Sequence, residues 1–303
     1  MTAHFYLMAE SFANNNQYTT IQIEEKIMRL SEDVQLINKH SNTNKLYTNY
    51  LEIYPQLFYA EYTVEEFICN VTKLKNEGVD RDVLNAFQKI IQKSQTTTFT
   101  SNEVISDLVD MTDEDNCHGI IAFHTIQGLQ NNLQVIYGID GWFQFRRHYL
   151  GLYPKNENFF MDECSKYFPN IVFHQNNRAT IGAILDDFPK KIVYYLTALN
   201  DRFRESEDGI RHRTQVLTHF SGNCSLDAIA SLEGKASRKL DFTFEFKDDK
   251  DKQQKVCCEP HIKLCKSDLA GDNTYYKYRI YFHEGIEDID NNKILVGHIG
   301  EHL

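Results

Sequence analysis

Apolar residues recur every three or four positions through much of the first 110 residues. This spacing is typical of amphipathic helices. In the clearest case, 20–40, the apolar stripe consists of Ile23, Ile27, Leu30, Val34 and Ile37. Thr63 and Glu66 have the spacing of a capping box at the start of another helix. We therefore expect a strand over 4–12, followed by helices over 20–40, 63–78, 80–94 and 101–110.

The pattern changes after residue 110. Short apolar runs over 119–126 and 133–139 are bounded by polar turns, which is typical of strands. The stretch 138–151, GIDGWFQFRRHYLG, is expected to be a strand or irregular. Farther along, 188–205 predicts a helix with the apolar stripe Ile192, Tyr195, Leu196, Leu199 and Phe203.

Alternation of apolar and polar residues dominates the last part of the chain. Three runs, 259–265, 276–283 and 293–300, follow the period of a strand. In the second run, Ile280 and Phe282 fall on the core face, opposite Lys277, Arg279, Tyr281 and His283. In the third run, Val296 and His298 fall on one side. We expect 255–303 to form an antiparallel sheet in which Ile280 and Phe282 are buried.

These patterns together predict an α+β protein. Its parts would be a mostly helical N-terminal region with an opening strand, a mixed α/β middle region and a C-terminal antiparallel sheet. The expected boundaries are 1–110, 111–247 and 248–303.

Composition narrows the class of protein. The chain has 303 residues, 42% of them hydrophobic, which is enough for a substantial core in two domains, or in one large domain with an appendage. The formal net charge is -11. Because general nucleic-acid binding relies on Lys and Arg, this charge disfavours a general binder of that kind. It leaves room for a local basic groove and suits a basic protein partner.

The sequence also bears on location. The first residues, MTAHFYLMAESF, lack the positive start and long apolar run of a signal peptide. No stretch approaches the roughly 20 apolar residues that span a membrane. Seven irregularly spaced Cys do not suggest a disulfide framework. We therefore expect a cytoplasmic protein that is not inserted in a membrane.

The common motifs for nucleotide binding and hydrolysis do not occur. The chain has no P-loop, no dinucleotide-binding glycine pattern, no serine-hydrolase elbow and no zinc-protease motif. The stretch CCEPHIKLC does contain potential zinc ligands, Cys257, Cys258, His261 and Cys265. In a strand, however, His261 and Cys265 would lie roughly 13 Å apart. We expect no metal there and no cofactor.

Two cationic regions are candidate sites. Arg146 and Arg147 lie among aromatic residues, which suits nucleic-acid binding, although a strand with inward rings and paired Arg explains the same pattern. The second region is one face of the C-terminal sheet. It would combine His261, Lys263, Arg279, Tyr281 and His283, with His298 nearby. Such groups can cleave RNA without a metal, because a base, an acid and a cation are sufficient.

The C-terminal pattern, EPHIKL followed by YRIYFHEG and KILVGHIGEHL, resembles the terminal strands of the RelE/HigB-type bacterial toxin fold. The resemblance covers about the last 45 residues of the 303. It implies a small ribonuclease that acts on the ribosome through basic residues with Tyr or His. The chain also resembles uncharacterised bacterial proteins of phage-defence islands. From Lys255 onward, Asp plus Glu outnumber Lys plus Arg, whereas toxins of this type are basic.

Three hypotheses follow. The chain is a recognition or scaffold subunit of a multi-protein bacterial anti-phage defence complex, with other proteins of the complex as partners. Alternatively, it is a RelE-like, metal-independent endoribonuclease controlled by its N-terminal region, with RNA or the ribosome as partner. In that case Arg279, Tyr281, His283 and His298 would be catalytic, and His261, Lys263, Arg146 and Arg147 would bind RNA. The third hypothesis is a metal-assisted nuclease that uses the Cys/His cluster, which the ligand spacing disfavours.

Overall fold

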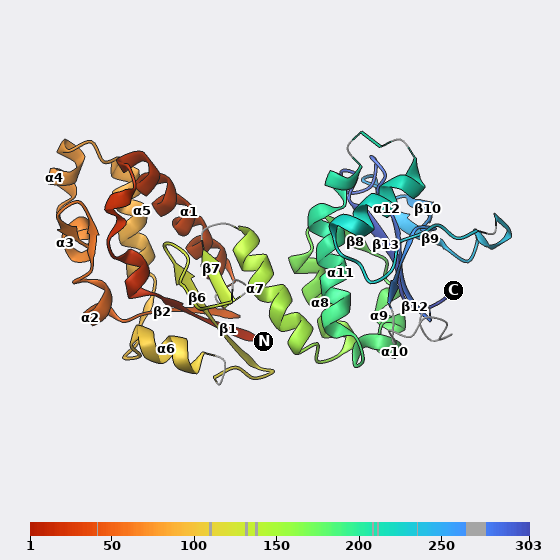
Figure 1. Cartoon of the computed structure of the whole chain (residues 1–303), viewed down its shortest axis with the longest axis horizontal. Helices are drawn as coiled ribbons and strands as arrows, with labels where there is room; N and C mark the ends of the chain where they lie inside the picture. The colour runs from red at the N-terminus through yellow and green to blue at the C-terminus, as the bar shows by residue number, and fades with distance from the viewer. Residues whose placement is uncertain are drawn as a thin grey trace. The chain divides into compact units, whose positions relative to one another are not determined.

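Figure 1 shows the computed structural model of the chain. The structure describes residues 1–40, 42–108, 111–130, 133–136, 139–207, 209–210, 212–234, 236–264 and 277–303. The chain divides into two compact units, Met1–Arg146 and Arg147–Leu303. This division coincides with neither of the boundaries, after 110 and after 247, that the sequence pattern suggested.

The first unit is built on a parallel sheet with the strand order β5-β2-β1-β6-β7. Neighbouring strands in this order are all parallel. The first strand in the chain therefore lies at the centre, and the order reverses beside it, as in doubly wound folds. The strands are β1 (Thr2–Leu7), β2 (Asn44–Thr48), β5 (Gln95–Thr96), β6 (Asn116–Ala122) and β7 (Gln134–Ile136).

Helices connect these strands. The longest are α1 (Thr20–Lys39) and α5 (Arg81–Gln92), which lie side by side in Figure 1. A capping box formed by Thr63 and Glu66 opens α3, as its sequence pattern predicted, but that helix is broken at Asn70 and continues as α4. The other elements of this unit are η1 (Ala9–Phe12), η2 (Asn15–Gln17), α2 (Tyr50–Ile53), β3 (Leu57–Tyr59), β4 (Tyr62–Thr63), α3 (Val64–Cys69), α4 (Val71–Asn76) and α6 (Ser101–Asp107).

Of the stretch 138–151, residues 139–151 are helical, so the expected strand or irregular segment was wrong there, and residue 138 lies outside the described residues. This helix, α7 (Ile139–Leu152), carries Trp142, Phe145 and Tyr149, all buried. Their spacing of three and four residues is that of one helix face. The aromatic residues thus follow a helical period, and the apparent alternation of Phe143 and Phe145 is incidental.

The second unit is built on a mixed sheet with the order β11-β12-β13-β8. The strands β11 (His261–Leu264), β12 (Tyr278–His283) and β13 (Ile294–Glu301) are antiparallel, as expected, and β8 (Ile171–Phe173) adds in parallel to β13. With helices and sheets in both units, the predicted α+β class is confirmed. The parallel sheet of the first unit was not anticipated.

Helices cover one face of this second sheet. Ile280 and Phe282 are fully buried in the core between the sheet and these helices, so this prediction is confirmed. The helical elements are α8 (Glu157–Tyr167), α9 (Asn177–Thr180), α10 (Gly182–Leu185), α11 (Pro189–Arg202), η4 (Arg204–Ser206), α12 (Arg213–Asn223) and η5 (Ala236–Arg238).

The opposite face of the sheet is also partly covered. A hairpin of β9 (Thr243–Lys247) and β10 (Gln253–Cys257) follows Phe242, and together they form a second core with Tyr281 and Leu295. The alternating Phe242, Phe244 and Phe246 supply the apolar side. The pattern of alternation had placed Tyr281 on the polar, solvent-facing side of the sheet. The hairpin covers that part of the face with apolar side chains.

A bulge at Gly297 changes which residues of β13 share a face. Tyr281 is opposite His298, but its neighbour Phe282 is opposite Val296, so Gly297 is an extra residue. The expectation that Val296 and His298 share a side is wrong for this reason. Val296 packs in the helix-side core, whereas His298 lies beside Tyr281. Gly297 also leaves room for the Phe244 ring, which a Cβ there would approach to 2.3 Å.

Within the described residues, no helix combines the length and the apolar character that crossing a membrane requires.

Candidate active site

Two rows of side chains cross the sheet of the second unit. His261, Tyr281 and His298 are register partners on β11, β12 and β13. Lys263 and Arg279 form the next row, with Gly300 beyond them. The strand register thus brings together five of the residues that the sequence predicted to form a site.

A segment before the hairpin places a carboxylate over these rows. Ser231 pairs with the edge strand β11: its N–H donates to the His261 carbonyl at 3.1 Å, and its carbonyl accepts a 2.9 Å bond from the His261 N–H. The Ser231 hydroxyl also lies 3.1 Å from His261 Nε2. Two residues later, Glu233 is therefore fixed above the sheet.

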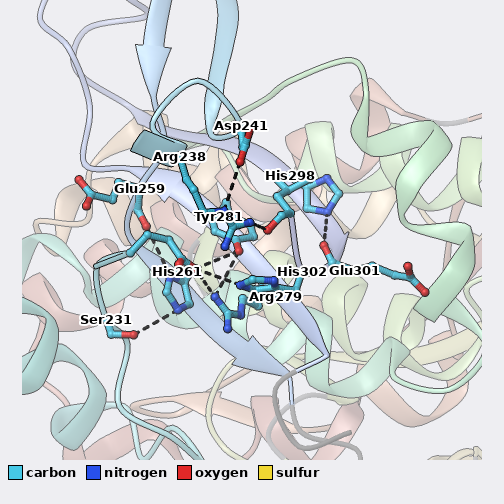
Figure 2. Close-up of polar contacts among 12 residues, drawn as sticks. Ser231, Arg238, Asp241, Glu259, His261, Arg279, Tyr281, His298, Glu301 and His302 are labelled. Carbon is cyan, nitrogen blue, oxygen red and sulfur yellow. Dashed lines mark hydrogen bonds and ion pairs between the residues drawn. The ribbon is translucent and has the colours of Figure 1, made fainter. Parts of the chain in front are cut away.

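Glu233 is the centre of the polar cluster. Its Oε1 pairs with the Arg279 guanidinium and accepts a 3.1 Å hydrogen bond from the Tyr281 hydroxyl. The same oxygen lies 3.6 Å from His261 Nδ1 and 3.4 Å from His302 Nε2. Figure 2 shows the side chains of His261, Arg279, Tyr281 and His302 converging. We call Glu233, His261, Arg279, Tyr281 and His302 the Glu233 cluster.

Packing makes one side of the cluster rigid. The Tyr281 ring stacks on Phe242 at 5.2 Å between centroids and is fully buried. Its hydroxyl lies 3.3 Å from Arg279 Nη1. Tyr281 therefore positions Glu233 and Arg279, and it presents no free surface of its own.

The other side of the cluster is open. The side chain of His302 is 34% exposed, whereas those of Glu233 and Arg279 are each 13% exposed. Arg238, with 31% of its side chain exposed, lies above Phe242 and bonds to Asp241 and to the Leu303 carbonyl. Figure 2 places Arg238 over the same part of the sheet. A ligand would thus meet His302 and Arg238 first.

Burial and charge set the protonation states. Burial lowers the pKa of His261 to about 4, with Arg279 adding to the effect. Burial likewise lowers the pKa of His302. Burial alone would raise the pKa of Glu233, but Arg279 and the imidazoles outweigh it and lower that pKa. Near neutral pH the cluster therefore combines a carboxylate, a guanidinium and neutral imidazoles.

These shifts predict how stability depends on pH. The pKa of His261 is about 4 in the folded chain, against about 6.5 when unfolded, so the unfolded chain binds the extra proton between these values. Stability should therefore fall as pH decreases from 6.5 to 4, with His261 contributing up to about 3 kcal/mol. Urea unfolding across this range measures the effect.

The matched variants are His261→Gln and His219→Gln. His219 is exposed on α12, so its replacement should leave the slope of stability against pH unchanged. The His261→Gln variant should have a shallower slope. Equal slopes in all three proteins would contradict the assignment.

Two other residues that the sequence predicted to belong to the site, His298 and Lys263, border the cluster. His298 lies with its ring centroid 5.9 Å from that of Tyr281, and its Nε2 lies 2.8 Å from the Glu301 carbonyl. Burial lowers the pKa of His298. Lys263 is half-buried opposite Arg279.

His283 does not join the cluster. It is at the far end of β12, where its Nδ1 accepts a 3.0 Å hydrogen bond from the Gly285 N–H. Burial lowers its pKa, and the neighbouring Glu284 opposes this. Glu284 forms a separate ion pair with Arg213.

Arg146 and Arg147 are internal structural residues. They are 2% and 4% exposed. Arg146 bonds to the Asn44 side chain, and Arg147 bonds to the Tyr167 carbonyl and the Asp201 carboxylate, both at 2.7 Å. Because both side chains are buried and bonded within the protein, the structure favours the alternative of paired Arg over the expected contact with nucleic acid.

The sequence analysis did not select Glu233, Ser231, Arg238 or His302 as site residues. Glu233 lies outside any helix or strand, before the β9–β10 hairpin, so no local pattern distinguishes it from the other 42 acidic residues of the chain. Its contact with Arg279 pairs the cationic face of the sheet with a carboxylate from earlier in the chain.

The described residues contain no group of three or more His, Cys, Asp or Glu side chains arranged to hold a metal ion. Cys265, one of the four candidate zinc ligands, is outside the described residues, so the expectation of no zinc there stays a prediction.

Comparison with known proteins gives no relative: no family model, no curated protein and no solved structure matches the chain.

Proposed function

We propose that the chain is a metal-independent RNA-cleaving enzyme whose active site is the Glu233 cluster. The observation that carries this proposal is the pair formed by Glu233 and the accessible His302, 3.4 Å apart, with Arg279 on the same carboxylate oxygen. A carboxylate that orients an imidazole is the arrangement that activates a general base. A cation beside it stabilises the negative charge that develops on phosphorus oxygens.

The residues suit transesterification of RNA. The neutral His302 accepts the proton of the ribose 2′-hydroxyl as the 2′-oxygen attacks phosphorus, and Glu233 stabilises the resulting imidazolium. Arg279 and Arg238 bind the phosphate oxygens. The bond from phosphorus to the 5′-oxygen breaks, and that oxygen takes a proton from water. The hydroxide that remains takes the proton of the His302 imidazolium, which restores the neutral base. The products are a 2′,3′-cyclic phosphate and a free 5′-hydroxyl.

The charges around the site favour an anionic ligand weakly. Arg238, Lys263 and Arg279 contribute three positive charges, against the two carboxylates of Glu233 and Asp241. This small excess supports binding of a phosphodiester that is delivered by a larger contact, such as the ribosome, rather than tight binding of free RNA. That is consistent with the proposed RelE-like role.

A second candidate function is recognition or scaffolding within a multi-protein bacterial defence complex in the cytoplasm. The observation that favours it is the ion pair of Arg279 with Glu233. This pair neutralises the guanidinium charge within the protein, so Arg279 would serve structure and not catalysis. The net charge of -11 would then serve a basic protein partner.

Cleavage of RNA separates these proposals. The full chain would be incubated with fluorescent single-stranded RNA, free and bound to ribosomes, with and without EDTA. We expect cleavage in at least one arm, products with cyclic phosphate ends, and no effect of EDTA. His302→Ala should lower the rate by roughly 10²–10⁴-fold, the usual contribution of a general base.

The control is His219→Ala, which removes an exposed imidazole from α12 and should cleave like the parent chain. Intact RNA in every arm would overturn the enzyme proposal and favour recognition. Activity that EDTA abolishes would overturn the metal-independent mechanism.

A further inference from the structure

A pocket of about 430 Å³ opens beside the β9–β10 hairpin. Its wall is formed by the segment after β8, which includes His174 and Asn176, and by hairpin residues that include Phe244, Glu245 and Gln253. The pocket is within the size range of small-molecule sites. No residue of the Glu233 cluster lines it, so the proposed catalytic groups do not account for it.

One short segment joins this pocket to the Glu233 cluster. Leu240 lines the pocket, while Arg238 and Phe242, two residues away on either side, border the cluster. Consecutive Cα atoms are about 3.8 Å apart, so Leu240 is at most about 7.6 Å along the chain from either neighbour. That separation is comparable to the size of one nucleotide.

The walls of the pocket suit a planar, polar ring. The His174 ring packs against Phe244 with centroids 5.3 Å apart, which gives an aromatic surface. Leu240 is 85% exposed, so an apolar side chain stands open to solvent at the rim. Nucleobases of single-stranded RNA bind to surfaces of this kind by stacking, and their edges bond to polar side chains.

The hydrogen-bonding groups narrow the choice of base. His174 Nδ1 accepts a 3.3 Å hydrogen bond from the Asn176 N–H, which fixes the orientation of the ring. Glu245 supplies a carboxylate with two adjacent acceptor oxygens, and Gln253 supplies an amide. Guanine presents two adjacent N–H donors, N1–H and the 2-amino group, on its Watson–Crick edge. A carboxylate can accept both.

From this geometry we infer that the pocket binds a guanine base of the RNA whose phosphate occupies the Glu233 cluster. The inference rests on the proposed RNA-cleaving function and adds its base specificity. Glu245 accepts the guanine N1–H and 2-amino donors, and Leu240 covers one face of the base.

Binding without cleavage tests the pocket separately from catalysis. Fluorescence anisotropy of the full chain would use short 2′-O-methyl oligouridines that contain one guanosine, one inosine or one adenosine. The 2′-O-methyl group prevents transesterification. Inosine lacks the 2-amino group, so the guanosine oligomer should bind about 5- to 150-fold more tightly than the inosine oligomer, the usual range for one bidentate contact.

Two variants complete the test. Glu245→Gln keeps the size of the side chain but replaces one acceptor by a donor, so it should remove the preference for guanosine. Asp251→Asn makes the same change at a side chain that is 88% exposed at the hairpin turn, outside the pocket, and should keep the preference. Both positions are exposed, so both variants should fold.

The outcomes distinguish the two proposals. Equal binding of all three oligomers, with cleavage of ordinary RNA by the same protein, would overturn only the guanine pocket. Binding of none of them, together with intact RNA in the cleavage assay, would overturn the proposed function as well. A preference for guanosine that Glu245→Gln leaves unchanged would also overturn the pocket assignment.

Discussion

Replacing Arg279 with alanine should lower the rate of RNA cleavage by about 10²–10³-fold, the usual effect of removing one charge-stabilising donor. The guanidinium pairs with Glu233 and contacts the Tyr281 hydroxyl at 3.3 Å, so it is fixed before a phosphate arrives. Such preorganisation is effective because no reorientation is needed as charge develops. Cleavage of a fluorescent RNA under single-turnover conditions measures the rate.

Two variants control this result. Arg279→Lys keeps the charge but loses the planar fork of donors, so its activity should lie between those of the parent and alanine proteins. Arg178→Ala removes an exposed guanidinium that pairs with Asp162 elsewhere in the same unit, and it should leave cleavage unchanged. If Arg279→Ala cleaves RNA at the parental rate while folded, the Glu233 cluster is not the active site.

The Phe282→Ala variant should lose about 3–5 kcal/mol of stability, the usual cost of removing a buried aromatic ring. Phe282 is fully buried on the helix side of β12, where its ring lies 5.4 Å from that of Phe203 in an edge-to-face arrangement. The cavity would open in the middle of the core of the second unit. The midpoint and slope of urea unfolding give the change in free energy.

Leu240→Ala is the matched control, because that side chain is 85% exposed in the same unit. Its replacement should change stability by no more than about 0.5 kcal/mol. A Phe282→Ala protein as stable as the Leu240→Ala protein would show that the face of β12 packed against Phe203 is assigned incorrectly.

The C-terminal sheet could be predicted because its strands are long enough to show their period. In β12 the alternation continues for six residues, Tyr278–His283. In the first unit, β2 has five residues and β5 only two, Gln95–Thr96. Strands of that length carry too few apolar positions to be distinguished from loops between helices. The strands expected over 4–12, 119–126 and 133–139 correspond to β1, β6 and β7, but β2 and β5 were missed, so the parallel sheet was not anticipated.

Only some residues of the candidate site could be placed from the alternation within single strands. The register of β11 and β12 follows from alternation, so His261, Arg279 and Tyr281 could be placed together. His298 joins them only because Gly297 is inserted as a bulge, which reverses the expected sides of β13. Glu233 joins through a single backbone pairing of Ser231 with His261, a contact between residues 30 positions apart.

The central position of β1 has a consequence for how the first unit forms during synthesis. Thr2 pairs with Asn116, so one edge of β1 has no partner until more than a hundred further residues have been made. At about 5–20 residues per second, this takes roughly 6–23 s. Throughout that time β1 presents an open edge to other nascent chains. Slowing translation shortly before β6 would lengthen this exposed interval, whereas slowing it after Ala122 would leave it unchanged.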